Sequence, residues 1–385
     1  MAQGARDAMR ILVVNYEYPP VGGGGGRVSA QVADELAVRG HEMRVQTSRV
    51  PGLPACEESA SGVAVRRVFS FRRSADTCSV PEMAGYVAAN LWPVLRAART
   101  WRPDVMHVHF AVPTGPVAWV AHFVTRVPYV LTAHLGDVPG GAPEQTDRLF
   151  RVVKPFTRPV WRSAAAVTAV SSHVAELARA AYGIDAKVIP NGVASCASQP
   201  PRADPHGILR LLFVGRMSVQ KNPVFLGKVL ASLRGRPWRA VFLGDGPLRG
   251  ALEQELRRGG VAAQCELRGW ADAGNVSAAM DASDLLVMPS LSEGLPVAAV
   301  EAASRGLAIA GSAIPGLADV LKDGVNGWSL PPSDEVSWSR VIESAIDGRV
   351  DLRRRQAESL RVAAGFDLSA IVDAYEQTLM NAAGA

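Results

Sequence analysis

The chain has 385 residues, 48% of them apolar, and exceeds the roughly 250 to 300 residues at which one hydrophobic core usually divides, so we expect two domains. Its net charge of +5 is modest for this length and does not indicate a nucleic-acid partner. No apolar run approaches the about 18 residues of a membrane-spanning helix, and the polar MAQGARD start lacks the apolar segment of a secretory signal. We therefore expect a cytoplasmic protein.

Strands and helices alternate through the first half of the chain. A buried-type strand is predicted at 11–15, followed by a glycine run at 22–26 and a helical pattern over 27–39. This alternation predicts a parallel α/β sheet with functional loops after its strands. The remaining predicted strands of this half are 43–47, 63–68, 105–109 and 129–132.

The second half repeats the same alternation after a Pro-, Ser- and Ala-rich linker at 194–206. We expect one domain over 1–193 and a second, also doubly wound, over 207–366. The second domain should hold strands at 209–214, 240–243, 265–268 and 285–288, and helices at 224–233, 248–257 and 297–305.

The glycine run lies between a predicted strand and helix. Its amides and the positive end of the helix are suited to a phosphate or a reacting sugar, although a flexible loop is the plainer interpretation. A dinucleotide-binding fingerprint is excluded, because no G-x-G-x-x-G spacing fits and no acidic residue ends the second strand.

Two cations follow the strand at 209–214 in the segment GRMSVQKN. Ligands of α/β folds bind at the carboxyl ends of strands, so Arg216 and Lys221 are placed to neutralise a diphosphate leaving group. Solvated surface charge explains the pair equally well when it is considered alone.

The segment SLSEGLPVAAVEA carries Glu293 in a loop and Glu301 inside the following helix. Pro296 suits a first helical turn, so nearby amides should lie at a positive helix end that favours phosphate. Glu301 is placed to accept both hydroxyls of a ribose, and Glu293 to face a transferred sugar. The amides concerned belong to Gly294, Leu295 and Val297.

These motifs, in this order, resemble the group 1 family of retaining GT-B glycosyltransferases, which includes glycogen-synthase-like and mannosyltransferase-type enzymes. The likeness covers nearly the whole chain and is densest in the E-x7-E motif from Glu293 to Glu301. The resemblance implies two doubly wound Rossmann-like domains that face each other across a cleft, with a C-terminal helix at 367–385 packing back on the first. The other motifs are GR-x4-K at 215–221, VIPNGV at 188–193, PP-x-x-GG at 19–24 and RGHE at 39–42.

The resemblance also implies roles for single residues. Arg216 and Lys221 should grip the diphosphate, Glu301 the ribose and Glu293 the donor sugar. The second domain would bind the nucleotide sugar and the first the acceptor. Gly23 and Gly24 should face the same cleft, and the backbone at Arg268 and Gly269 should hold the base.

The segment LTAHLGDVPG resembles the family's H-G-G-D loop, with Leu135 in place of a glycine. The resemblance implies that His134 lies near the donor sugar and Asp137 near the acceptor. His107 and His109 share one face of a strand, where His109 is equally suited to an acceptor contact or to packing. No third metal ligand accompanies them and no D-x-D pair occurs, so we expect no metal and no cofactor.

Cations recur among apolar residues over 148–162, as in a helix that rests on an anionic membrane or binds an anionic acceptor. The more ordinary interpretation is a solvated helix face packed on the first domain. The sequence gives no indication of oligomeric state.

The expected reaction is metal-independent transfer of a sugar, with retention, from a nucleotide diphosphate sugar to an acceptor hydroxyl. A UDP-sugar is favoured and a GDP-sugar comes next, because Glu301 suits ribose and UDP is frequent in the family. The acceptor is expected to be a small natural-product scaffold such as an aminocyclitol. The alternatives are a lipid-linked or envelope glycan as acceptor, a nucleotide-sugar epimerase of the same architecture, and a silent binding protein.

Overall fold

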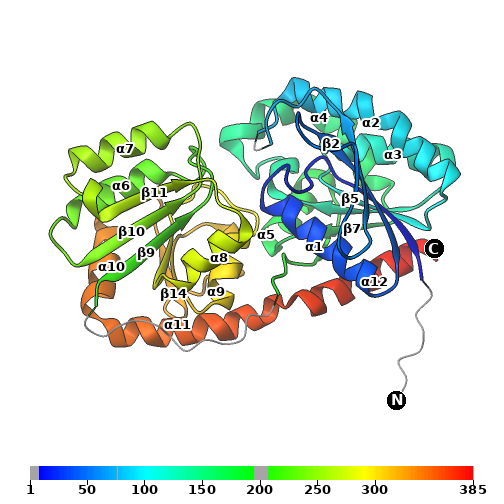
Figure 1. The fold of residues 1–385 in the computed structure, drawn as a ribbon. Helices are drawn as coiled ribbons and strands as arrows, with labels where there is room; N and C mark the ends of the chain where they lie inside the picture. Colours follow the sequence, from blue (N-terminus) through cyan, green and yellow to red (C-terminus); the bar gives the residue numbers. More distant parts are fainter. Residues whose placement is uncertain (1–7, 76, 195–206, 385) are drawn as a thin grey trace, which may run out of the picture. The chain divides into compact units, whose positions relative to one another are not determined.

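The fold is that of a computed structural model, which describes residues 8–75, 77–194 and 207–384 (Figure 1). The chain forms two compact units. Unit 1 is Met1–Gly192 together with Leu368–Ala385, and unit 2 is Val193–Asp367. Val193 groups with unit 2 because its N–H donates to the carbonyl of Phe366 at 3.0 Å. All but the first residue of the expected linker at 194–206 lies outside the described residues.

Unit 1 is built on a sheet in the order β3-β4-β2-β1-β5-β6-β7-β8, in which all neighbouring strands are parallel except β3 with β4. Central strands of such a sheet are covered on both faces, which explains the continuous apolar runs. The strands are β1 (Arg10–Val14), β2 (Glu42–Arg49), β3 (Cys56–Glu58), β4 (Ala64–Phe69), β5 (Val105–His109), β6 (Tyr129–Ala133), β7 (Ala166–Ala169) and β8 (Lys187–Val188).

Helices of unit 1 form two packed groups: α3 contacts both α2 and α4, and α1 contacts α12, which follows unit 2 in the sequence (Figure 1). A short 3-10 helix, η1 (Leu135–Asp137), follows β6. The helices are α1 (Gly24–Val38), α2 (Val80–Thr100), α3 (Thr114–Thr125), α4 (Pro143–Arg162), α5 (Ser172–Tyr182) and α12 (Leu368–Ala383).

Unit 2 has a fully parallel sheet in the order β11-β10-β9-β12-β13-β14. Its strands are β9 (Leu209–Val214), β10 (Trp238–Leu243), β11 (Cys265–Gly269), β12 (Leu285–Met288), β13 (Ala308–Ser312) and β14 (Gly327–Leu330). Its helices are α6 (Pro223–Ser232), α7 (Arg249–Arg258), α8 (Ala273–Asp281), α9 (Val297–Ser304), α10 (Glu335–Asp347) and α11 (Arg349–Ala363), with 3-10 helices η2 (Ala262–Gln264), η3 (Pro315–Leu317) and η4 (Ala364–Phe366).

Apolar side chains from one face of this second sheet form a core with α6, α7 and α10. Phe242, Trp238 and Trp338 are almost completely buried there, and Phe225 packs edge-on against Trp338. Both units are therefore Rossmann-like α/β sheets, as the alternation of strands and helices predicts. The strand predictions at 105–109, 209–214 and 285–288 match the structure residue for residue.

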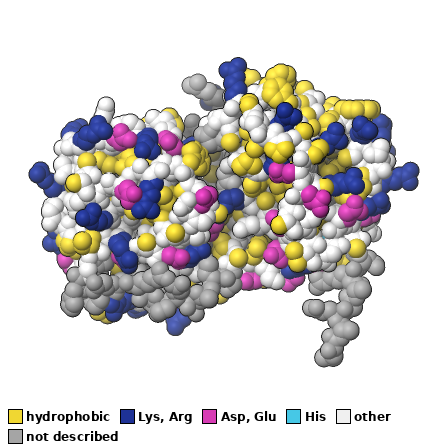
Figure 2. All heavy atoms as spheres, in the orientation of Figure 1, with side chains coloured by type: hydrophobic (Ala, Val, Ile, Leu, Met, Phe, Trp, Pro, Cys, Tyr) yellow, Lys and Arg dark blue, Asp and Glu magenta, His cyan; other side chains and the backbone are white. Residues whose placement is uncertain are grey.

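On the face drawn in Figure 2, Lys and Arg side chains are interspersed with Asp and Glu, and apolar side chains lie between them. The positive net charge is therefore not gathered into one broad basic patch on that face.

Candidate active site

Loops that follow β9, β10 and β11 in unit 2 are joined by backbone hydrogen bonds. Gly215 N–H donates to Leu243 O at 2.9 Å, Met217 N–H to Asp245 O at 2.8 Å, and Gly244 N–H to Gly269 O at 2.7 Å. The carboxyl ends of three neighbouring strands are thus fixed to one another, at the edge where α/β folds bind ligands.

Lys221 and Glu293 meet at this edge, although 72 residues separate them along the chain. Lys221 Nζ lies 2.5 Å from Glu293 Oε1, and the two side chains are 19% and 7% exposed. Gln220 fixes both loops in register, because its carbonyl accepts from Leu291 N–H at 2.7 Å and its Nε2 donates to Ser292 O at 3.0 Å. The side chain of Arg216, half-buried in the same loop, has no hydrogen bond or ion pair among the described residues.

The α9 helix starts at Val297, directly after the loop that holds Glu293. Pro296 is its N-cap, one position earlier than the first-turn place expected for it. First-turn amides have no partner within a helix, so this turn presents donors and the positive helix end to an anion. Glu301 lies in the second turn of α9 and is half-buried.

Gly316, in η3, packs directly against the Glu293 loop. A Cβ at this position would lie 1.7 Å from the Glu293 carbonyl oxygen, so no other residue fits without moving the loop. A hollow of about 300 Å³ adjoins η3, lined among others by Pro315, Leu317 and Ser329. Sequence reasoning missed Gly316, whose only signal is the Pro-Gly pair that follows β13.

Arg268 and Gly269, expected at the base, end β11. The Arg268 guanidinium is held by Glu266 through two hydrogen bonds of 2.8 Å, so its side chain is already paired. Gly269 adopts a left-handed φ of 72° and its carbonyl is used by Gly244. Because the Arg268 side chain is already paired, only the backbone of this loop remains to contact a ligand.

The glycine run in unit 1 forms the start of α1, with Gly23 as the N-cap and Gly24 as the first helical residue. Gly23 N–H donates to Glu17 Oε2 at 3.2 Å, and a Cβ on Gly23 would meet nothing within 4 Å. The turn is therefore open on the Gly23 side, while a carboxylate already occupies one of its amides.

His134 lies against this glycine turn. Its ring stacks on Phe110 at 4.1 Å, and a Cβ at Gly25 would lie 3.2 Å from its Nδ1. Its Nε2 lies 3.4 Å from Nδ1 of His109. Burial lowers the pKa of His134 to about 3, so the imidazole is neutral at physiological pH. Phe110 has a left-handed φ of 69°, a conformation that the sequence does not reveal.

Asp137 and His109 were expected at the acceptor, but both side chains are 1% exposed. Asp137 accepts from His134 N–H at 2.8 Å and from Ala111 N–H at 2.5 Å, so its carboxylate joins the loops after β5 and β6. Burial raises the pKa of Asp137 to about 8. His109 packs on His107 at 4.2 Å, which favours the packing interpretation. The burial of both side chains therefore does not support a direct contact with an acceptor.

The basic segment at 148–162 belongs to α4, which contains Pro155 and Pro159 within the helix. Phe150 and Trp161 are buried against unit 1, and Phe156 is 77% exposed. The side chains of 144–149 lie outside the described residues; the exposed cations of the described part are Arg151, Lys154, Arg158 and Arg162. In the described part of the chain, no helix combines the length and apolarity needed to cross a membrane.

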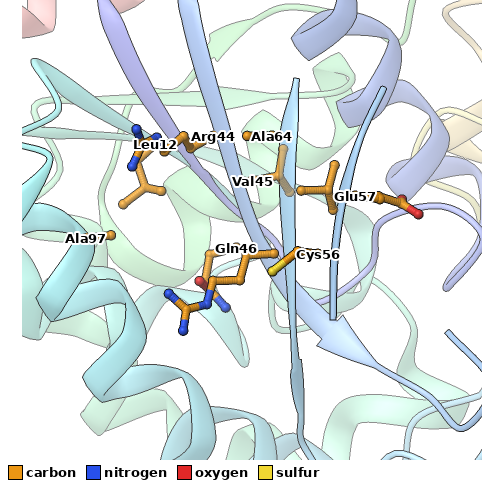
Figure 3. A pocket seen from close by; sticks show the side chains of 10 residues that line it. Leu12, Arg44, Val45, Gln46, Cys56, Glu57, Ala64 and Ala97 are labelled. Atoms are coloured by element: carbon orange, nitrogen blue, oxygen red, sulfur yellow. The ribbon is translucent and has the colours of Figure 1, made fainter. Parts of the chain in front are cut away.

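Within the described ranges, no group of three or more His, Cys, Asp or Glu side chains is arranged to hold a metal ion. A separate hollow of about 220 Å³ lies in unit 1 among β1, β2, β3, β4 and α2 (Figure 3). Leu12 and Gln46 line it from the middle of their strands, so it is distinct from the glycine turn at the strand ends.

Two family models match the sequence: Glycosyltransferase Family 4 over residues 22–195 and Glycosyl transferases group 1 over residues 201–362. The chain is also 30% identical to 2-deoxystreptamine N-acetyl-D-glucosaminyltransferase of Streptomyces fradiae, over 86% of this chain and 84% of that relative. The chain belongs to the group 1 glycosyltransferases.

This group 1 glycosyltransferase is 28% identical to glycogen synthase of Mycobacterium tuberculosis, over 97% of this chain and 95% of that protein. Its fold matches the structure of Anabaena Alr3699/HepE in complex with UDP-glucose, with a TM-score of 0.77 at 19% identity, covering 97% and 99% of the two chains. The predicted GT-B class with two Rossmann-like units is thereby confirmed. Membership of the family makes the protein an enzyme that uses nucleotide sugars.

Proposed function

We propose that the enzyme transfers a sugar, with retention of anomeric configuration, from a UDP-sugar to a hydroxyl of a small aminocyclitol, with a GDP-sugar as the second choice of donor. The relative named for 2-deoxystreptamine supports the acceptor class, and the UDP-glucose complex of Alr3699/HepE supports the donor class. A lipid-linked or envelope glycan is the competing acceptor. We expect the reaction to take place in the cytoplasm.

The observation that carries this proposal is the Lys221–Glu293 pair beside the first turn of α9. Arg216 and Lys221 would hold the diphosphate, whose negative charge grows as the bond to the sugar breaks. Glu293 would contact the sugar near its anomeric carbon. Glu301 would accept the ribose hydroxyls, and the backbone at Arg268 and Gly269 would hold the base.

In the proposed reaction, the bond between the anomeric carbon and the diphosphate oxygen breaks on the face where the acceptor oxygen attacks. The acceptor proton passes to the leaving diphosphate, which therefore acts as the base. Unit 1, in which His134 and the glycine turn lie together, would bind the acceptor. Because cationic side chains and a helix end supply the positive charge, we propose that transfer requires no divalent metal and no cofactor.

The deciding experiment incubates the protein with UDP-, GDP- and dTDP-glucose or N-acetylglucosamine, with and without 2-deoxystreptamine, and follows products by mass spectrometry and NMR. We expect an α-linked product from a UDP-sugar, at a rate that EDTA leaves unchanged. Epimerised donor formed without acceptor would favour the epimerase. An inverted linkage, or an EDTA-sensitive rate that Mg²⁺ restores, would contradict the mechanism.

A further inference from the structure

The hollow among β1, β2, β3, β4 and α2 has polar side chains that the proposed transfer reaction does not use (Figure 3). Its volume of about 220 Å³ far exceeds the roughly 10 to 15 Å³ that one water needs. Leu12, Ala64 and Ala97 give it apolar walls, and the small side chain of Ala64 leaves space between its larger neighbours.

Three polar side chains cross the sheet side by side at one end of this hollow. Gln46 on β2 is paired in register with Arg66 on β4, and Arg66 is paired with Cys56 on β3. Residues in register on neighbouring strands point to the same face of a sheet. Gln46, Arg66 and Cys56 therefore form one row along the lining of the hollow.

The orientation of the Gln46 amide follows from its neighbours. Asn90 Nδ2 donates to Tyr86 O at 3.2 Å, so Asn90 Oδ1 is the acceptor that faces Gln46. Gln46 Nε2 donates to that oxygen at 3.0 Å. Gln46 is 2% exposed, and its Oε1 receives no hydrogen bond from any described residue. A side chain that is almost completely buried thus keeps an acceptor oxygen without a protein donor beside the hollow.

The Arg66 guanidinium also lacks an anionic partner within the described structure. Its exposed side chain forms no ion pair or hydrogen bond with a described residue, and the nearby Glu57 is paired with Arg67 at 2.6 Å. Arg44, at the other end of the lining, is held over the ring of Trp101 at 4.4 Å. The hollow therefore combines a guanidinium that lacks an anion with an amide oxygen that lacks a donor.

We propose that this hollow binds a small hydroxylated oxyanion, whose phosphate or carboxylate pairs with Arg66 and whose hydroxyl donates to Gln46 Oε1. Charge-assisted hydrogen bonds from a guanidinium favour both kinds of oxyanion. Cys56 borders the same site and carries a free thiol, so a bound ligand covers it. This site is independent of the proposed sugar transfer.

The test uses glycerol 3-phosphate and D-glycerate as probes, with binding followed by titration calorimetry and by the rate at which iodoacetamide alkylates Cys56. Peptide mass spectrometry separates Cys56 from the other cysteines. We expect at least one probe to bind and to slow alkylation of Cys56 about fivefold or more at saturation. Stronger binding of the phosphate or of the carboxylate identifies the source of the oxyanion.

Two matched comparisons assign the contacts. Arg66→Gln should weaken binding about tenfold or more, whereas Arg99→Gln on the exposed face of α2 should not. Propyl phosphate, which has no hydroxyl, should bind less tightly than glycerol 3-phosphate, and this comparison requires no change in the buried Gln46. The proposal is overturned if neither probe binds at 10 mM, which corresponds to about 3 kcal/mol of binding free energy or less. It is also overturned if Arg66→Gln leaves the affinity unchanged, or if propyl phosphate binds as tightly as glycerol 3-phosphate.

Discussion

Lys221 and Glu293, two of the charged residues of the candidate donor site, compensate each other, whereas Arg216 takes no part in this pair. Lys221 and Glu293 form a 2.5 Å pair that is largely enclosed, so each charge offsets the other's loss of hydration. Arg216 has no such partner among the described residues. Its charge is therefore available to an anion without breaking a contact.

Glu293→Gln should lower the rate of transfer by about 100-fold or more, because the amide keeps the shape of the side chain and loses its charge. The loop stays fixed by Gln220 and Gly316, but Lys221 loses its ion-pair partner, so the melting temperature should fall while the protein remains folded. Steady-state kinetics and thermal unfolding check this. The control is Glu343→Gln, the same substitution at a half-exposed side chain on α10. Near-normal turnover of Glu293→Gln would remove Glu293 from the reaction centre.

The buried histidines of unit 1 predict sensitivity to acid. Burial lowers the pKa of His107 and His134 to about 3, whereas an unfolded chain protonates histidine near pH 6.5. The unfolded state therefore binds more protons, and stability is lost progressively as pH falls from about 6.5 to 3. Asp137 acts in the opposite direction, since its pKa of about 8 makes the native state bind a proton below that pH.

His107→Gln removes one histidine that binds a proton in the unfolded state but not in the native state. The glutamine side chain should still reach Thr132, to which His107 Nε2 is hydrogen-bonded at 2.9 Å. The fall in unfolding free energy of unit 1 between pH 5.5 and 4.5 should become smaller by up to about 1.4 kcal/mol. Hydrogen exchange of β5 and β6 amides at several pH values measures it. An unchanged pH dependence would show that His107 is not held neutral.

A dense local motif in the sequence singles out Glu293 and Glu301 as candidates, whereas Arg216 and Lys221 are candidates through their position after a strand and the family resemblance. The contacts of Gly316, Gln220 and Phe110 could not be found from the sequence, since they depend on segments far apart in the chain. The burial of His109 and Asp137 likewise could not be inferred from the sequence. No sequence pattern shows that both oxygens of Asp137 are taken by backbone N–H groups.

At the scale of elements, strands whose apolar runs lie at the centre of a sheet were predicted best, as β5, β9 and β12 show. The α1 helix begins at Gly24, three residues before the predicted start, because glycine has a low helix propensity and gave no helical signal. The three-residue β3 was not predicted, since every residue in it is exposed.

The η3 turn determines where the Glu293 loop lies, so Gly316→Ala should displace that loop. A methyl group 1.7 Å from the Glu293 carbonyl oxygen requires a shift of more than 1 Å. A displacement of that size should lower kcat/KM for transfer by about 100-fold. Gly250→Ala in α7 is the matched control, because its Cβ meets nothing within 4 Å and helix propensity favours alanine by about 0.5 to 1 kcal/mol. Equal activity of both variants would contradict the role of η3.

At the scale of the whole molecule, α12 follows unit 2 in the sequence but belongs to unit 1. Glu376 on α12 accepts from Arg39 at 2.8 Å and lies 3.0 Å from His41 Nε2. Tyr375 packs against His107 at 5.1 Å, and Thr378 accepts from Lys187 at 3.0 Å. The stability of unit 1 therefore depends on a helix that follows unit 2 in the sequence.

Glu376→Ala should destabilise unit 1 by about 3 kcal/mol, because a buried carboxylate that pairs two partners is removed. Asp373→Ala removes a 57% exposed partner of the same Arg39 and should cost less than about 1 kcal/mol. Hydrogen exchange should show faster opening of β5, β6 and α12 in Glu376→Ala and no change in unit 2. Equal effects of the two substitutions would indicate that α12 is held mainly by its apolar contacts.

The Lys221–Glu293 pair also affects which of two ligands binds more tightly, the nucleotide sugar or the nucleotide diphosphate. An anion that takes the ammonium of Lys221 must separate it from the carboxylate, so binding is an exchange of partners. A nucleotide sugar offers the released Glu293 a sugar hydroxyl, whereas a bare nucleotide diphosphate leaves it without a partner. If the proposed donor site is correct, the spent nucleotide is therefore held less favourably than the donor, and re-forming the pair helps to expel it after each turnover.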